Sequence, residues 1–267
     1  MASAISLITL LTDFGSRDFF VPSVKGVMLG INSQARVLDL SHDIEAQNIE
    51  QAAFFLKSCY RFFPDGTIHV VVVDPGVGSD RRSILVSTSR YFFLAPDNGV
   101  LSHIFEEELS VEVRAIENKQ YRLDSEGATF DGRDLFAPAA AWLTKGQTPG
   151  SYGPLIHNYV TLPKSEPQMQ KGKLVGKIVY IDHFGNLISN ITPADLDTFR
   201  SVTKQEGKAI QLGDITIHGI KTHYAEGALG LPEALFNSNG QLEVFIKQGH
   251  AAERCDAKVG QRLEVGS

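Results

Sequence analysis

The segment Thr67–Val73 reads TIHVVVV, a run made up almost entirely of β-branched residues. Runs of this kind are typical of strands buried on both faces, between layers of helices. The run stops at Asp74-Pro75-Gly76, residue types that break a strand and begin a turn. The sequence therefore predicts a central strand at Thr67–Val73, inside a sheet that helices cover.

Strand-like and helix-like segments alternate around this central run. Further strands are predicted at Ile5–Leu11, Arg36–Leu40, Ser83–Thr88, Tyr91–Ala95 and Val111–Ala115. Helices are predicted for residues 18–31 (starting near Pro22), for the helically spaced Ile49, Ala52, Ala53, Leu56, Cys59 and Tyr60, and for residues 134–145. This alternation predicts a three-layer α/β domain with a mainly parallel sheet over residues 1–163.

The composition changes at Pro163–Lys173, which reads PKSEPQMQKGK. Its prolines, lysines and polar residues predict a linker at residues 164–172. Beyond it, strand-like runs dominate: Lys173–Ile181, Ala209–Leu212, Asp214–His218, Gln241–Lys247 and Gln261–Val265. Residues 173–267 are therefore expected to form a smaller all-β domain, either a barrel or a sandwich.

Composition restricts the function classes. The 267 residues carry a net charge of −6, so the basic surface typical of nucleic-acid binding is not expected. The apolar run Ile5–Leu11 is too short to span a bilayer and lacks the charged start of a signal peptide. Cys59 and Cys255 are too few for a disulfide framework, which favours a cytoplasmic location without membrane attachment.

Charged residues gather where the predicted strands end. Asp13 follows the first strand, and Asp74 follows the central strand and begins a loop that contains Arg81. A third cluster, Thr129–Asp134, precedes a predicted helix. Ligands of open α/β sheets bind beyond the carboxyl ends of the strands, so these residues are candidates for a site. Each aspartate can alternatively cap a helix, and Asp134 fits an N-cap.

Several familiar catalytic templates are missing. Gly76 and Gly78 lack the third glycine of a dinucleotide-binding loop, and Gly127 and Gly132 lack the lysine of a P-loop. No G-x-S-x-G elbow occurs. The histidines, including His218, show no spacing typical of metal ligands, so no metal site is expected.

The second predicted domain contains two polar turns of interest. Asp182-His183-Phe184-Gly185-Asn186 lies between two strand-like runs, where Asp and Asn can simply build a turn. Alternatively, Phe184 stacks on a flat ring and Asn186 offers its amide to an adenine edge. Asn237-Ser238 allows the same two interpretations, and Glu243 also fits a solvent-facing strand position.

Six segments in order resemble the S-adenosylmethionine hydroxide adenosyltransferases, the adenosine-forming hydrolases related to the bacterial fluorinase and chlorinase. The segments are LLTDFGSRDFFVPSVKGVM, VVVDPGVGSDRR, APDNGVLS, TFDGRDLFAPAAA, YIDHFGNLISNI and NSNGQLEV. The resemblance implies an α/β N-terminal domain, a β C-terminal domain, and a homotrimer that binds S-adenosylmethionine between subunits.

The resemblance also implies roles for individual residues. Asp13 would bind both ribose hydroxyls, and Phe184 and Asn186 would hold the adenine. The methionine end would be bound by Asp182 and Ser238, with Tyr224 and Glu243 in the same region. The implied hydrolytic triad is Asp-Arg-His, of which Asp74 and Arg81 match the first two members. Asp131 stands where the family pattern has histidine.

The resemblance thus implies hydrolysis of S-adenosyl-L-methionine to adenosine and L-methionine, by in-line attack of water at C5′. No cofactor is expected, because the sulfonium is already an activated leaving group. Asp131 and Asp74 together would repel a halide and could still orient a water. Two alternatives stay open: a halogenase-like 5′-transferase that uses another nucleophile, and a catalytically impaired protein that only binds S-adenosylmethionine or adenosine.

Overall fold

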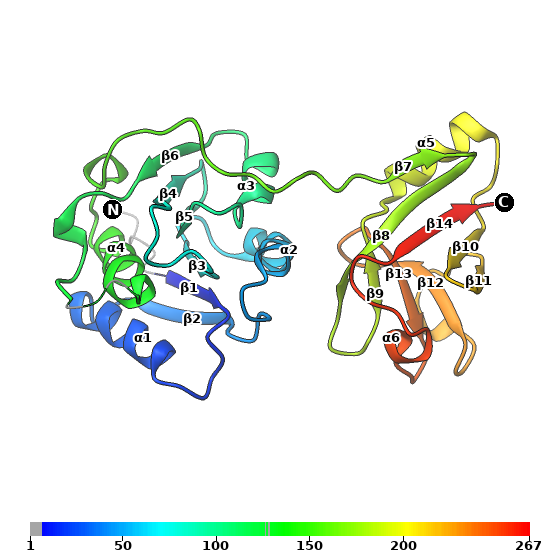
Figure 1. Ribbon diagram of the computed structural model, residues 1–267, viewed down its shortest axis with the longest axis horizontal. Helices are drawn as coiled ribbons and strands as arrows, with labels where there is room; N and C mark the ends of the chain where they lie inside the picture. The colour runs from blue at the N-terminus through cyan, green and yellow to red at the C-terminus, as the bar shows by residue number, and fades with distance from the viewer. Residues whose placement is uncertain (1–6, 126, 128) are drawn as a thin grey trace. The chain divides into compact units, whose positions relative to one another are not determined.

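The computed structural model describes residues 7–125, 127 and 129–267. The chain divides into two compact units, with the boundary between Leu162 and Pro163 (Figure 1). Each unit has a hydrophobic core of its own. The two units are therefore described separately.

The N-terminal unit is built on a six-stranded sheet with the strand order β2-β1-β3-β5-β4-β6. The strands are β1 (Leu7–Thr12), β2 (Arg36–Ser41), β3 (Ile68–Val72), β4 (Ser83–Ser87), β5 (Phe92–Pro96) and β6 (Glu112–Ala115). The pairings β1–β2, β1–β3 and β3–β5 are parallel, while β4 pairs antiparallel with both β5 and β6. The expected mainly parallel sheet is thus a mixed one with an antiparallel edge.

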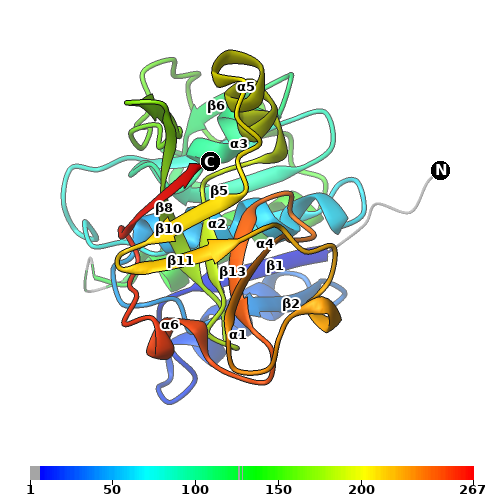
Figure 2. The same ribbon diagram turned by 90° about the vertical axis from the view of Figure 1, so that its right-hand side faces the viewer.

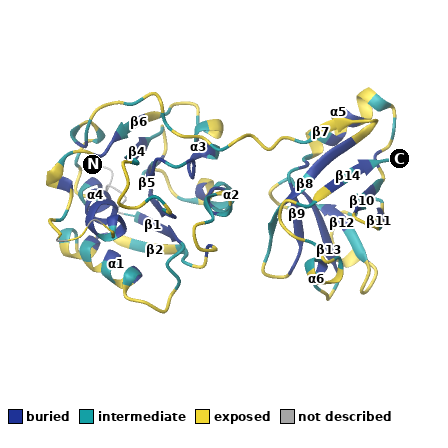
Figure 3. Ribbon diagram, in the orientation of Figure 1, coloured by how far each residue is buried: buried dark blue, intermediate teal, exposed yellow. Residues whose placement is uncertain are grey.

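Helices cover both faces of this sheet, as the central run predicted. They are α1 (Phe20–Ile31), α2 (Ile49–Cys59), α3 (Ser102–Glu107) and α4 (Ala137–Thr144). Val70 and Val72 belong to the core cluster that includes α1 and α4, whereas Val71 and Val73 belong to the cluster that includes α2 and α3. Because side chains alternate along a strand, all five residues of β3 are buried, four of them apolar and the fifth His69. The neighbouring strands β1 and β5 are likewise mostly buried (Figure 3).

The predicted helix at residues 134–145 begins differently from the expectation. A π-helical turn, η3 (Gly132–Phe136), leads directly into α4. The prediction that Asp134 is an N-cap was wrong, because Asp134 lies inside this turn, buried and paired with Arg133 at 2.6 Å. The strand predicted at Ile5–Leu11 is β1 from Leu7 onward, and its first two residues lie outside the described residues.

Short 3₁₀ turns complete the connections between these elements. They are η1 (Tyr60–Phe62), η2 (Lys119–Tyr121) and η4 (Pro149–Ser151) in the N-terminal unit, and η5 (Tyr224–Glu226) in the C-terminal unit. The helix α3 and these turns were not predicted, since each is too short to show a helical period.

The C-terminal unit is an antiparallel sheet with the strand order β11-β10-β14-β8-β9-β13-β12, with β7 beside β8 (Figure 2). Its strands are β7 (Gln168–Gln170), β8 (Lys173–Ile181), β9 (Leu187–Ser189), β10 (Ala209–Leu212), β11 (Ile215–His218), β12 (Pro232–Phe236), β13 (Leu242–Ile246) and β14 (Arg262–Gly266). The end strands β11 and β12 contact each other, so the sheet is a nearly closed barrel.

Three features of this unit differ from the sequence prediction. The expected linker contains β7, whose residues pair with β8. The expected all-β domain also carries α5 (Pro193–Thr203) and the short α6 (Ala251–Arg254). A capping box fixes the start of α5, because Thr192 and Asp195 each bind the other's backbone N–H. Among the described residues, no helix is long and apolar enough to cross a membrane.

Candidate active site

Two of the predicted aspartates follow neighbouring strands of the N-terminal sheet. Asp13 comes directly after β1, and Asp74 comes two residues after β3. The two strands are parallel and pair Thr12 with Val72, so the carboxyl ends of both strands lie at the same edge of the sheet. This edge is the place where open α/β sheets bind their ligands.

Asp13 is held by a backbone group from the next connection. Its Oδ2 accepts a hydrogen bond from the Gln47 N–H at 2.8 Å. Gln47 has a φ of 68°, a left-handed conformation that is uncommon for a residue other than glycine. Beside it, the Thr12 hydroxyl lies 2.8 Å from His42 Nδ1 and fixes the strand end on the same connection. The Asp13 carboxylate therefore has a defined position at the sheet edge.

Arg81 and Asp74 form the centre of the second cluster. Arg81 Nε donates to both carboxylate oxygens of Asp74, at 3.1 and 2.9 Å, and Arg81 Nη2 also donates to Asp74 Oδ2. Arg81 Nη1 donates to Ser83 Oγ at 2.8 Å, which anchors the guanidinium to β4. The Asp74 side chain is 5% exposed and that of Arg81 12% exposed, so little water competes with this pair.

Asp131 binds the same guanidinium, although it lies fifty residues beyond Arg81 in the chain. Its Oδ2 accepts from Arg81 Nη2 at 2.5 Å, and its Oδ1 accepts from Arg122 Nη2 at 3.4 Å. Asp131 stands at the N-cap position of η3, yet its side chain makes no capping hydrogen bond. Its carboxylate is therefore directed to the two arginines rather than to the helix start.

This arrangement changes the expected electrostatics of the cluster. The sequence suggested two nearby carboxylates with Arg81 to tune them, and in the structure the Arg81 guanidinium binds both Asp74 and Asp131. Burial opposes the charge on Arg81, but the hydrogen bonds that Arg81 donates to Asp74 and Asp131 outweigh this effect and raise the pKa of Arg81. With Arg122 beside Asp131, two positive charges balance two negative ones.

Aromatic packing links the Asp131 segment to the segment after Asp13. The ring centroids of Phe14 and Phe130 lie 5.8 Å apart in an edge contact. A Cβ at Gly132 would lie 3.2 Å from ring atoms of both phenylalanines, so glycine allows this close approach. All three polar clusters that the sequence singled out in this domain thus meet at one region.

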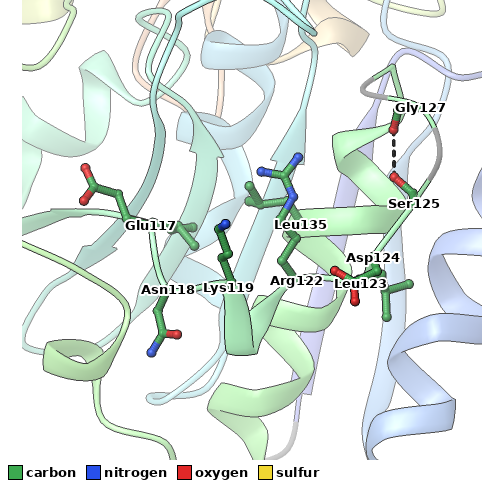
Figure 4. Close-up of a pocket in the computed structure, with 10 residues that line it drawn as sticks. Glu117, Asn118, Lys119, Arg122, Leu123, Asp124, Ser125, Gly127 and Leu135 are labelled. Atoms are coloured by element: carbon green, nitrogen blue, oxygen red, sulfur yellow. Dashed lines mark hydrogen bonds between the residues drawn. The ribbon is translucent and has the colours of Figure 1, made fainter.

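Two adjoining cavities open at this region. The smaller, of about 290 Å³, is lined by Arg81, Asp131, Arg122 and neighbouring residues. The larger, of about 560 Å³, is shown in Figure 4 and is lined by Lys119, Arg122 and Ser125 among others. Both cavities share Arg122, together with Ile116, Glu117 and Leu135. The charged cluster is therefore open to a small molecule or to water.

The C-terminal unit places Asp182 and Asn186 in one tight turn. Asp182 Oδ1 accepts from the backbone N–H groups of Phe184 and Asn186, at 2.9 and 2.8 Å, and its Oδ2 accepts from Asn186 Nδ2 at 2.9 Å. Gly185 has a φ of 82°, and a Cβ there would lie only 2.3 Å from His250 Nδ1. The turn presents Phe184 with 71% of its surface exposed, although phenylalanine is normally buried.

A second group in the same unit surrounds Glu243. Its carboxylate accepts from the Tyr224 hydroxyl at 2.7 Å and from Asn237 Nδ2 at 3.1 Å. Glu243 is only 2% exposed, so its interpretation as a solvent-facing strand residue was wrong. Burial raises the pKa of Glu243, and the nearby charge of Asp182 raises it further. Ser238 lies exposed on the adjacent turn.

Several residues of these groups were not predicted from the sequence. Ser83 accepts a hydrogen bond from Arg81, and Arg122 donates one to Asp131. The backbone N–H of Gln47 donates to Asp13. No recognised motif marks any of them, although Ser83 is only two residues from Arg81; Gln47 reaches its partner, Asp13, only through the fold. Asn237 was visible only as part of a turn, and its contact with Glu243 is new.

The fold and these clusters define a class of protein. Residues 8–153 match the model of the SAM hydroxide adenosyltransferase N-terminal domain, and residues 176–264 match that of the corresponding C-terminal domain. The chain therefore belongs to the SAM hydroxide adenosyltransferase family.

Curated relatives share nearly the full chain. A protein of Methanocaldococcus jannaschii named (R)-S-adenosyl-L-methionine hydrolase is 33% identical, over 98% of this chain and 96% of its own. A protein of the same name from Thermus thermophilus is 30% identical, over 97% of this chain and 98% of its own. A fluorinase from Actinoplanes is 26% identical, over 99% of this chain and 98% of its own.

Solved structures show the same fold. The crystal structure of an uncharacterized conserved protein from Thermotoga maritima superimposes with a TM-score of 0.88 at 31% identity, covering 97% of this chain and all of that one. This agreement confirms the predicted combination of an α/β unit with a smaller β unit.

Proposed function

We propose that the chain hydrolyses S-adenosyl-L-methionine to adenosine and L-methionine. The observation that carries this proposal is the cluster in which Arg81 binds both Asp74 and Asp131 beside a cavity. The names of the most similar curated relatives support the substrate and the reaction. Their names specify the (R) form of the substrate, and we extend that preference to this chain.

The reaction proceeds by attack of a water oxygen at C5′ of the substrate. The new C5′–O bond forms as the C5′–S bond breaks, the sulfur keeps the bonding electron pair, and one proton leaves the water. The sulfonium departs as neutral methionine sulfur, so the leaving group needs neither a metal nor an organic cofactor. The protein's task is to hold the water in line with the C5′–S bond.

Asp74, Arg81 and Asp131 are proposed to carry out this task. The guanidinium fixes the two carboxylates by directional, charge-assisted bonds. Two fixed carboxylates can orient a water and accept its proton. In this proposal the Asp131 carboxylate takes the place of the histidine that the family pattern has. It serves as the proton acceptor, and Arg81 holds it in place.

The remaining predicted residues are proposed to bind the substrate. Asp13 accepts hydrogen bonds from the ribose hydroxyls. Phe184 stacks on the adenine, and Asn186 accepts from its amino group through Oδ1, because its Nδ2 is bonded to Asp182. The methionine end contacts Asp182, Ser238, Tyr224 and Glu243.

The proposed assembly is a homotrimer with its sites between subunits. This assembly would unite the N-terminal group around Asp74 with the C-terminal group around Asn186 from a neighbouring subunit. Cys59 and Cys255 are both free thiols, which supports the proposed cytoplasmic location.

A second candidate is a halogenase-like 5′-transfer, which the similarity to fluorinases favours. The carboxylate of Asp131 opposes it, because it lines the smaller cavity and accepts hydrogen bonds, which a water can donate and a halide cannot. The third candidate, a protein that only binds the substrate, depends on Asp131 being unable to replace histidine.

One incubation separates these three candidates. The (R) and (S) sulfonium epimers of S-adenosylmethionine are each mixed with the protein, with and without chloride or fluoride, and the products are separated by chromatography. We expect adenosine and methionine in equal amounts from the (R) epimer, and no turnover in an Asp74→Ala control. A 5′-halogenated adenosine or unchanged substrate would contradict the proposal.

A further inference from the structure

Arg122 lies at the junction of the two cavities and has no role in the function proposed so far. It is half-exposed, lines both cavities, and places its Nη2 3.4 Å from Asp131 Oδ1. It belongs to the segment that follows η2, nine residues before Asp131 in the chain. In Figure 4 its side chain runs from that segment into the larger cavity, beside that of Lys119.

The hydrogen bonds of the cluster show what Arg122 supplies. Arg81 donates hydrogen bonds from Nε and Nη2 to Asp74. Its Nη1 donates to Ser83. Only Nη2 remains for Asp131, and it reaches one carboxylate oxygen, Oδ2. A carboxylate held through one oxygen can still rotate about its last bond, whereas one held through both oxygens has a fixed plane.

Charge balance leads to the same residue. Asp74 and Asp131 are both largely buried and share the single positive charge of Arg81. A buried carboxylate without a partner charge is costly. Arg122 is the second cation that the described residues bring to Asp131.

We propose that Arg122 is a positioning residue for the hydrolysis, which fixes the plane of the Asp131 carboxylate so that it can orient the attacking water. This role rests on the proposed function, because it concerns the orientation of that water. Arg122 acts through Asp131 and need not touch the substrate.

The test compares kcat and KM of five variants with those of the wild type. Arg122→Met keeps an unbranched side chain and removes the charge, Arg122→Lys keeps the charge, and Lys119→Met is the matched control. Lys119 lines the same larger cavity, and Lys119→Met removes the same charge, but the structure assigns Lys119 no contact with Asp131. Asp131→Ala and its combination with Arg122→Met complete a double-mutant cycle.

We expect Arg122→Met to lower kcat about fivefold, the size of a partly exposed ion pair, with KM changed less than about twofold. Arg122→Lys should recover most of that loss, and Lys119→Met should match the wild type. In the Asp131→Ala background, Arg122→Met should have no further effect, because the carboxylate that it positions is gone.

The possible failures are distinguishable. If the wild type forms adenosine and Arg122→Met has the same kcat, the role of Arg122 is wrong and the proposed function stands. If the loss is equally large in the Asp131→Ala background, Arg122 does not act through Asp131. If the wild type forms no adenosine, the proposed function fails, and the role of Arg122 fails with it.

Discussion

Asp131 stands where the resemblance to the family implies a histidine, and we propose a specific task for its carboxylate. Its carboxylate meets Arg81 and Arg122 and leaves the start of η3 uncapped. We expect Asp131→Ala to lower turnover by about 10²–10⁴, the usual effect of losing a group that manages a proton. Asp131→His should keep or raise activity, since it restores the family pattern.

Steady-state turnover of the three proteins provides this test. Adenosine binding, measured by calorimetry, is the control for folding, because Asp131 is not assigned to the nucleoside. Equal rates for the wild type, Asp131→Ala and Asp131→His would remove Asp131 from the mechanism.

His69 is a buried histidine of β3 that affects stability rather than catalysis. It is fully buried, its Nδ1 lies 2.7 Å from Thr9 Oγ1, and its ring stacks on Phe93. Burial lowers the pKa of His69 to about 3. In the unfolded chain a histidine binds its proton near pH 6.5, so the unfolded state gains protons first as the pH falls.

The free energy of unfolding should therefore decrease below pH 6.5, with His69 contributing about 1.4 kcal/mol per pH unit. His69→Gln is uncharged and can still bond Thr9, so it should remove that part of the slope between pH 6 and pH 4. The exposed His218, changed to Gln, is the control. Denaturant titrations that give the same slope for the wild type and His69→Gln would contradict this account.

At the scale of elements, the turn Asp182–Asn186 depends on a glycine that no other residue can replace without strain. Gly185 combines a φ of 82° with a contact to His250 that leaves no room for a Cβ. The left-handed conformation alone costs about 1–2 kcal/mol in a residue with a side chain. Gly185→Ala should therefore displace Phe184 and Asn186 and weaken adenosine binding at least tenfold.

Gly213→Ala is the matched control for this turn. Gly213 has a φ of 57° in the β10–β11 turn, but its Cβ would meet nothing closer than Gln261 Nε2 at 3.7 Å. The Gly213→Ala substitution should lower the melting temperature and leave the affinity for adenosine unchanged. Calorimetry that finds equal affinity for the two variants would show that the Asp182–Asn186 turn does not hold the nucleoside.

Most strands of the fold could be predicted from the sequence, within one or two residues. Buried strands such as β3 and β5 consist mostly of apolar residues, and that local signal is strong. The helix α5 was missed, because its sequence is polar and its start depends on the capping box at Thr192. The π-helical turn η3 has no local signature that separates it from an ordinary helix start.

The sequence singled out residues that the fold brings together, but it could not predict most of their contacts. Asp74 and Arg81 are seven residues apart in one loop, so their pairing follows from a local motif. Asp131 lies fifty residues beyond Arg81, and only the fold brings the two together. For the same reason, the sequence suggested that Arg81 tunes two nearby carboxylates but could not show that its guanidinium binds both.

At the scale of the whole molecule, the residues proposed to bind one substrate belong to two separate units. The C-terminal unit presents Phe184 and Tyr224 to solvent, 71% and 48% exposed, as expected of groups that await a ligand or a partner. The proposed trimer explains this exposure. Light scattering should therefore give about three times the mass of one chain, 29.2 kDa.

Co-expression of two inactive variants tests the sharing of sites. One subunit carries Asp74→Ala, and the other carries Phe184→Ala with Ser238→Ala, exposed positions that the fold tolerates. If each site joins two neighbouring subunits, random mixing leaves about a quarter of the sites intact and restores that fraction of activity. If each site lies within one subunit, the mixture stays inactive.

The central claim is that water attacks C5′ of the substrate. The measurement that tests it most directly is turnover of (R)-S-adenosyl-L-methionine in ¹⁸O-labelled water, followed by mass spectrometry of both products. We predict one heavy oxygen in adenosine, bonded to C5′, and none in methionine, with no labelled adenosine formed by Asp74→Ala. Adenosine without the label, or a label in methionine, would contradict the account.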